Sequence, residues 1–110
     1  MGSFGGYRSM WIVLMFDLPV KTKPQRKAYA DFRKGLKEDG FMQMQYSVYA
    51  RHCASEDNAH MHINRAKVDI PDKGEVRIML MTDKQYERML VFYGNFRKKA
   101  EKAASQLEFF

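Results

Sequence analysis

The sequence is short of several residue types and segments, and each shortage excludes a class of protein. Its single cysteine, Cys53, excludes a disulfide framework and a cysteine-based zinc site, and it is typical of a reducing compartment. The longest apolar run, Met10–Phe16, has 7 residues, whereas a membrane span needs about 20. The N-terminus lacks the basic, apolar and small-residue layout of a secretory signal. We therefore expect neither a membrane protein nor a secreted one, and 110 residues leave room for one domain.

The positive charge is concentrated in one segment. Hydrophobic residues make up 45% of the chain and charged residues 29%, which is enough for a packed core. The formal net charge is +6. Residues 21–37 hold 7 basic residues and one acid, Asp31, so this segment alone accounts for the whole excess. The basic residues are Lys21, Lys23, Arg26, Lys27, Arg33, Lys34 and Lys37.

On a helix these cations form a stripe. At 100° per residue, Arg26, Arg33 and Lys37 fall within about 40° of one another, and the other lysines adjoin them. The stripe lies opposite the expected buried face, which consists of Ala28, Tyr29, Phe32 and Leu36. Such a stripe suits a polyanion such as nucleic acid, and a merely solvated helix surface is an equally good interpretation at this point.

Local signals predict alternating strands and helices. Met10–Leu18 is apolar and β-branched and predicts a strand. Thr22 and Gln25 have the spacing of a capping box, so a helix should begin there and end near Asp39, before Gly40. Residues 41–51 predict two strands divided near Tyr46. A second helix should begin at Ser55 and end before Pro71, with a buried side formed by Ala59, Ile63, Ala66 and Ile70.

The remaining elements lie after a turn at residues 72–74. Glu75–Met81 predicts a strand, Asp83–Glu87 a helical turn, and Met89–Tyr93 a last strand. From Asn95 the charged run predicts a short helix, which ends in the apolar residues Leu107–Phe110. We expect the Gly- and Ser-rich residues 1–9 to be a flexible extension, residues 10–94 to form the domain, and residues 95–110 to be a C-terminal tail.

The order β-α-β-β-α-β with a fifth strand predicts an α+β, ferredoxin-like domain. Both helices should cover one face of the sheet. The first strand is nevertheless apolar on both faces, since Trp11, Val13 and Met15 alternate with Ile12, Leu14 and Phe16. The uncovered face needs a second copy of the chain, so we predict a homodimer through the sheet. Met89–Tyr93 is the natural strand to pair with the partner's sheet edge.

Asp17 is the candidate for chemistry. It is the one polar residue of the first strand, and its simplest interpretation is a turn residue before Pro19. In a dimer it could meet its own copy, and a hard cation such as Mg²⁺ would relieve the repulsion. His60 and His62 would point apart on a helix, and His52 beside Cys53 has no third partner for nucleophilic catalysis.

An ordered set of short motifs resembles the CRISPR-associated Cas-two (Cas2) family, and its details resemble the type II branch. The resemblance covers residues 10–94. It is carried by VLMFDLP (13–19), RKAY (26–29), GF (40–41), QYSVY (45–49), GEVR (74–77) and TDKQY (82–86). Phe16 stands where many members of the family have tyrosine.

This resemblance implies a prokaryotic cytoplasmic homodimer that joins the Cas-one (Cas1) integrase and captures double-stranded DNA as new spacers in antiviral defence. It also implies a Mg²⁺-dependent endonuclease, with Asp17 as metal-binding and catalytic residue and one Mg²⁺ per dimer between the two Asp17 side chains. Many cations and one acid per chain favour DNA binding as the main role, through Lys21, Lys23, Arg26, Lys27, Arg33 and Lys37. A stand-alone metal-dependent endonuclease acting on RNA or double-stranded DNA is the alternative.

Overall fold

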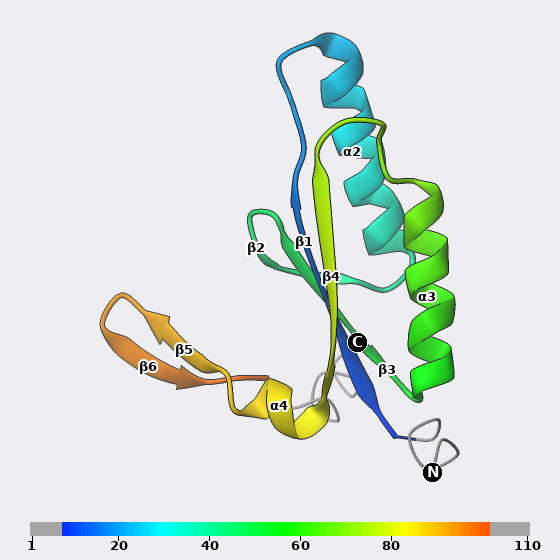
Figure 1. Ribbon diagram of the computed structural model, residues 1–110. Helices are drawn as coiled ribbons and strands as arrows, with labels where there is room; N and C mark the ends of the chain where they lie inside the picture. Colours follow the sequence, from blue (N-terminus) through cyan, green and yellow to red (C-terminus); the bar gives the residue numbers. More distant parts are fainter. Residues whose placement is uncertain (1–7, 102–110) are drawn as a thin grey trace.

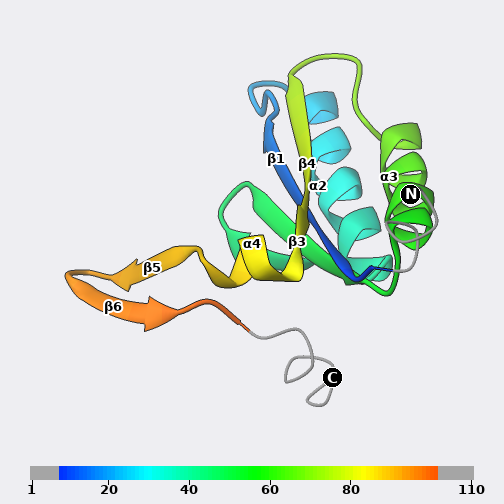
Figure 2. The ribbon, with the colours of Figure 1, turned by 60° about the horizontal axis from the view of Figure 1, so that its bottom comes forward.

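The computed structural model describes residues 8–101, in which two helices cover one face of a four-stranded antiparallel sheet (Figure 1). The sheet order is β2-β3-β1-β4, and Figure 2 shows α2 and α3 on the same side of it. This confirms the α+β class and the β-α-β-β-α-β order of ferredoxin-like domains. The elements are β1 (Met10–Asp17), α2 (Lys23–Glu38), β2 (Met42–Gln45), β3 (Val48–Cys53), α3 (Glu56–Val68), β4 (Glu75–Thr82), α4 (Asp83–Glu87), β5 (Leu90–Tyr93) and β6 (Phe96–Lys99).

The ends of α2 are those that the sequence predicts. The Gln25 backbone N–H donates to Thr22 Oγ1 at 3.2 Å, and the Thr22 N–H donates to Gln25 Oε1 at 3.0 Å, which completes the capping box. At the other end Asp39 is the C-cap, and Gly40 has a φ of 89°. Glycine adopts this left-handed conformation without a steric penalty, so the chain leaves the helix there.

The second helix, α3, begins after its N-cap Ser55 as predicted, but its buried side differs in one residue. Ala59 and Ala66 are buried, Ile63 is half-buried, and His62 is buried as well. His62 Nδ1 lies 2.7 Å from Asp39 Oδ2, while Arg65 Nη1 donates to Asp39 Oδ1 at 2.8 Å. Burial acts to raise the pKa of Asp39, yet these two partners hold that pKa below its ordinary value. The pairing of α3 with the end of α2 therefore explains a buried histidine that periodicity did not indicate.

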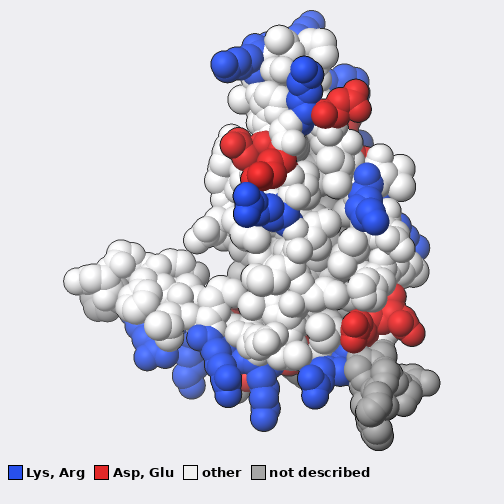
Figure 3. Space-filling model, in the orientation of Figure 1, with Lys and Arg blue, Asp and Glu red and all other residues white. Residues whose placement is uncertain are grey.

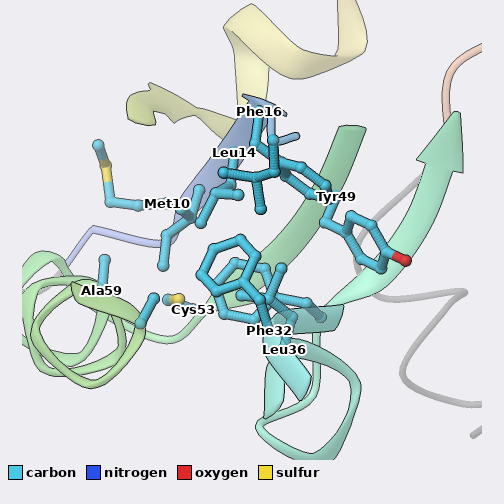
Figure 4. Packing of buried hydrophobic residues seen from close by; sticks show 12 residues of the cluster. Met10, Leu14, Phe16, Phe32, Leu36, Tyr49, Cys53 and Ala59 are labelled. Carbon is cyan, nitrogen blue, oxygen red and sulfur yellow. The ribbon is translucent and has the colours of Figure 1, made fainter. Parts of the chain in front are cut away.

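Apolar side chains fill both faces of the sheet, as the first strand predicts. Toward the helices, Ile12, Leu14 and Phe16 of β1 pack with Phe32 and Leu36 of α2, and Figure 4 shows this cluster. On the opposite face the buried cluster contains Trp11, Val13, Ala50, Tyr86 and Ala100. Trp11 and Tyr86 are stacked with ring centroids 3.8 Å apart, so α4 is fixed to this second face.

The C-terminal part of the described chain corrects one prediction. Residues 96–99 form the strand β6, not a helix, and β6 pairs with β5 in a hairpin that extends from the body of the molecule (Figures 1 and 3). The turn is Gly94-Asn95, with a φ of 63° at Gly94, and a two-residue turn of this kind joins antiparallel strands. The charged run after Asn95 favours a helix by its composition, but the Gly94-Asn95 turn reverses the chain and pairs the run with β5 instead. Residues 1–7 and the apolar end at 107–110 lie outside the described residues.

No helix among residues 8–101 is both long and apolar enough to cross a membrane.

Candidate functional site

Asp17 closes β1 on the face of the sheet opposite α2 and α3, the same face that carries the Trp11 cluster. Its neighbours on that face along β1 are Met15, Val13 and Trp11, as the alternation of the strand predicts. The side chain is exposed, whereas most of β1 is buried. The strand ends here because Pro19, two residues on, has no N–H to donate to a neighbouring strand.

The backbone of Gly74 fixes the position of this strand end. Gly74 has a φ of 103°, and a Cβ built on it would lie 2.7 Å from the Asp17 carbonyl oxygen and 2.8 Å from Leu18 Cδ2. Contacts this short leave no space for any side chain. The turn before β4 thus lies directly against the residue that carries the candidate carboxylate.

A second acid, Glu75, faces Asp17 across the β1–β4 ladder. The register pairs Asp17 with Glu75, and partners in an antiparallel ladder lie on the same face. Sequence reasoning missed Glu75 because only the register brings the two carboxylates together. Two facing carboxylates repel each other, so a positive charge at this strand end is favourable.

Arg77 supplies that positive charge through a forked contact. Its Nε donates to Glu75 Oε1 at 3.1 Å and its Nη2 to Glu75 Oε2 at 3.2 Å. This contact lowers the pKa of Glu75 and raises that of Arg77. Figure 3 shows acidic side chains directly above a basic one near the upper ends of β1 and β4. An open surface cavity of about 280 Å³ lies here, lined by Met15, Phe16, Asp17, Ser47, Val48, Glu75 and Arg77.

The carboxylates at this strand end are of the kind that bind Mg²⁺, but one chain supplies only part of the ligands that a complete site needs. Mg²⁺ prefers oxygen ligands, usually one or two carboxylates together with water. Asp17 offers an exposed carboxylate, and Glu75 offers a second that Arg77 engages. Residues 8–101 of one chain nevertheless contain no group of three or more possible metal-ligating side chains. Asp17 would hold the ion, and a second copy of the chain would have to supply the rest of the protein ligands.

The basic stripe of α2 is mostly exposed. Figure 3 shows basic side chains around the upper end of α2, where the helix begins. Lys23, Lys34 and Lys37 are exposed and make no ion pair among residues 8–101. Lys27 pairs with Asp31 at 2.7 Å, and such an exposed pair is weak and easily exchanged. Arg26 is exposed as well, and its Nη1 donates to the carbonyls of Val20 and Lys21 at the helix start.

Arg33 is the exception within the stripe. It is half-buried, and its Nε donates to Tyr49 Oη at 2.8 Å, which raises the pKa of Arg33. Its guanidinium also lies 5.6 Å from the centre of the Tyr29 ring. The structure therefore places Arg33 at the edge of the stripe, where it joins α2 to β3. On the opposite side of the helix Phe32 and Leu36 are buried, while Ala28 and Tyr29 are half-buried.

The histidines and the cysteine do not form a shared site. His60 is exposed beside Glu56, and His62 is buried against Asp39, so the two point apart as predicted. His52 Nε2 lies 3.3 Å from Asp83 Oδ1, on the same face of the sheet as Trp11. Cys53 belongs to the cluster on the other face, so His52 and Cys53 cannot act together.

Comparison with known proteins gives one consistent family. The profile of the family described as "CRISPR associated protein Cas2" matches residues 10–89. The "CRISPR-associated endoribonuclease Cas2" of Parvibaculum lavamentivorans is 52% identical over 101 residues, which cover 92% of this chain and 100% of that protein. Proteins of the same name from Paracidovorax avenae and Flavobacterium psychrophilum are 46% and 44% identical. These matches cover 96% and 94% of this chain, and 97% and 90% of those proteins.

Proposed function

The chain belongs to the Cas2 family of CRISPR-associated proteins, and on this premise we propose that it is a homodimer that binds duplex DNA during spacer acquisition. In this role it bridges units of the Cas1 integrase in the cytoplasm of a prokaryotic cell and supplies geometry, while the integrase performs the joining chemistry. The type II branch is the part of the family that we assign it to, on the motifs given above.

The exposed cations of α2 carry this proposal. They project from one rigid helix, and they include three lysines without an ion-pair partner among the described residues, Lys23, Lys34 and Lys37. Contacts from lysine and arginine to phosphates fix a protein on a duplex without reading its bases. Within α2 six cations outnumber two exposed acids, Asp31 and Glu38, so the field of the helix favours a polyanion.

Binding of duplex DNA should therefore depend steeply on salt. Neutralising about six phosphates would give a slope of log affinity against log salt near −5. Changing Lys23 and Lys34 to Gln should flatten the slope by about two units and weaken binding of every sequence by about tenfold. Fluorescence anisotropy with two unrelated duplexes measures both quantities.

The matched control changes Lys67 of α3 and Lys73 of the turn before β4 to Gln, which removes the same charge from exposed positions outside both α2 and the hairpin. A loss confined to one DNA sequence, an unchanged slope, or an equal loss in the control would contradict binding by the stripe.

The dimer is supported by two unpartnered features of the described chain. The outer edge of β4, which has 8 residues, has no neighbouring strand in the four-stranded sheet. The hairpin exposes Leu90, Phe92 and Tyr93, which are 60%, 53% and 60% accessible. An isolated two-stranded hairpin is only marginally stable in water. We propose that β5 pairs with the partner's β4 edge, as the sequence predicts, and that β6 follows on its outer side.

Sedimentation at micromolar concentration should give about twice the mass of the chain. Phe92→Glu should weaken the dimer at least about tenfold, because it places a charge where an aromatic ring would be buried. Tyr46→Glu is the control, since Tyr46 is 75% accessible in the β2–β3 turn. A folded monomer of the wild-type chain under these conditions would refute the architecture.

A second function, Mg²⁺-dependent phosphodiester cleavage, is favoured by the position of Asp17. The related proteins are named endoribonucleases, so RNA is the first substrate to test and duplex DNA the second. In the proposed dimer the two Asp17 carboxylates would hold one Mg²⁺, which would polarise a phosphoryl oxygen and activate water. The chain's own part is to hold a carboxylate at a rigid strand end beside Glu75 and Arg77.

A further inference from the structure

We propose that Arg77 binds the backbone phosphate that is brought to Asp17, and that Glu75 positions Arg77 for this contact. The inference rests on the proposed cleavage function, because it assigns the substrate-binding group of the same site. It adds Arg77 as the phosphate ligand and Glu75 as a positioning residue, neither of which belongs to the basic stripe of α2.

The geometry of Arg77 supports this assignment. Arg77 is the one cation among the residues that line the cavity beside Asp17. Its side chain is 71% accessible, so a large ligand can reach it. It stands on β4, two residues beyond Glu75 and therefore on the same face of the strand. The two contacts to Glu75 hold one side of the guanidinium, and its remaining N–H donors stay available to another acceptor.

The charge balance of the cavity explains why a cation is needed. Asp17 and Glu75 contribute two negative charges at the cavity, and a phosphodiester adds a third. Arginine binds phosphate oxygens through paired N–H donors, which suits both the recognition and the orientation of the phosphate. The Glu75 carboxylate keeps the guanidinium near Asp17, but it also neutralises part of the charge. Glu75 therefore sets the position of Arg77 at some cost in affinity.

This arrangement has a signature in a double-mutant cycle. Without metal, Arg77→Gln should weaken binding of a short single-stranded RNA by about tenfold, the size of a charge-assisted hydrogen-bonded contact. Glu75→Gln should strengthen binding, by about threefold, because the guanidinium is no longer neutralised. In the Arg77→Gln background the same change of Glu75 should strengthen binding less, because there it removes only the repulsion between Glu75 and the phosphate. Arg88→Gln, an exposed arginine after α4, is the matched control and should change binding by less than Arg77→Gln.

The experiment measures RNA affinity by anisotropy in EDTA, together with the KM and kcat of cleavage in Mg²⁺. Arg77→Gln should raise KM, and Arg77→Lys should restore part of the loss. If Glu75→Gln strengthens binding equally in both backgrounds, or if Arg88→Gln weakens it as much as Arg77→Gln, the proposal is wrong. If the wild-type chain cleaves nothing, the cleavage function is wrong, and the cycle in EDTA still decides whether Arg77 binds phosphate.

Discussion

Replacing Asp17 by Asn is expected to reduce Mg²⁺-dependent cleavage by about a thousandfold or more, because stabilisation by a bound metal contributes several kcal/mol and 1.36 kcal/mol corresponds to a factor of ten. Asn keeps the shape of the side chain and removes only its charge. The side chain is exposed at the end of β1, so the fold should not change. The loss would therefore report the carboxylate itself.

Two other properties should survive this substitution. The repulsion between Asp17 and Glu75 across the ladder disappears, so the free energy of unfolding without metal should stay the same or rise slightly. Spacer integration in the presence of the integrase should also persist, because the proposed role of this chain there is DNA binding and geometry. Cleavage and integration would then separate in a single variant.

Three assays compare wild type with Asp17→Asn: cleavage of labelled RNA and duplex DNA, sedimentation to follow the dimer, and spacer integration with the integrase. Asp72→Asn is the control. Asp72 is an exposed acid in the turn before β4. Cleavage that persists in Asp17→Asn would place the metal site elsewhere. Integration that is lost while the dimer and DNA binding remain would assign the carboxylate to spacer capture, and the order of the two proposed functions would reverse.

Replacing Gly74 by Ala is expected to lower the free energy of unfolding by about 3 kcal/mol. A Cβ at this position would lie 2.7 Å from a backbone oxygen, and the φ of 103° is one that residues with a side chain rarely adopt. Relief would require the turn to move away from the ends of β1 and β4. For a domain of this size the midpoint of thermal unfolding should fall by roughly 10–20 °C.

Gly94→Ala is the matched control for this prediction. Gly94 also has a positive φ, 63°, but nothing lies within 4 Å of a Cβ built there. Its cost should be about 1 kcal/mol, since only the backbone preference opposes it. Thermal unfolding followed by circular dichroism compares the two variants, and equal losses would show that the contact with Asp17 does not matter.

The parts of the fold that depend on residues close together in the sequence could be predicted. The capping box at Thr22 and Gln25 needs only residues three apart, and Gly40 needs only its own backbone freedom. The two apolar faces of β1 follow from alternation within one strand, and they indicate the second cluster around Trp11.

The remaining features depend on segments far apart in the chain. Glu75 becomes part of the site through the register of β1 with β4, and no local pattern specifies a register. His62 is buried against Asp39, and Arg33 is half-buried because it donates a hydrogen bond to Tyr49 of β3. The strand β6 was missed for a different reason, since its cations outweighed a turn signal that was present at Gly94.

The stack of Trp11 on Tyr86 gives this protein a built-in optical probe. Trp11 is the only tryptophan of the chain, and it is 1% accessible. Its stacking partner lies in α4, the element from which the hairpin extends. Indole emission shifts to longer wavelength when water reaches the ring, so any rearrangement that lifts α4 from the sheet would change the fluorescence of the unlabelled chain. Movements of the hairpin relative to the sheet can thus be followed in real time, without a dye, while the protein meets its partners.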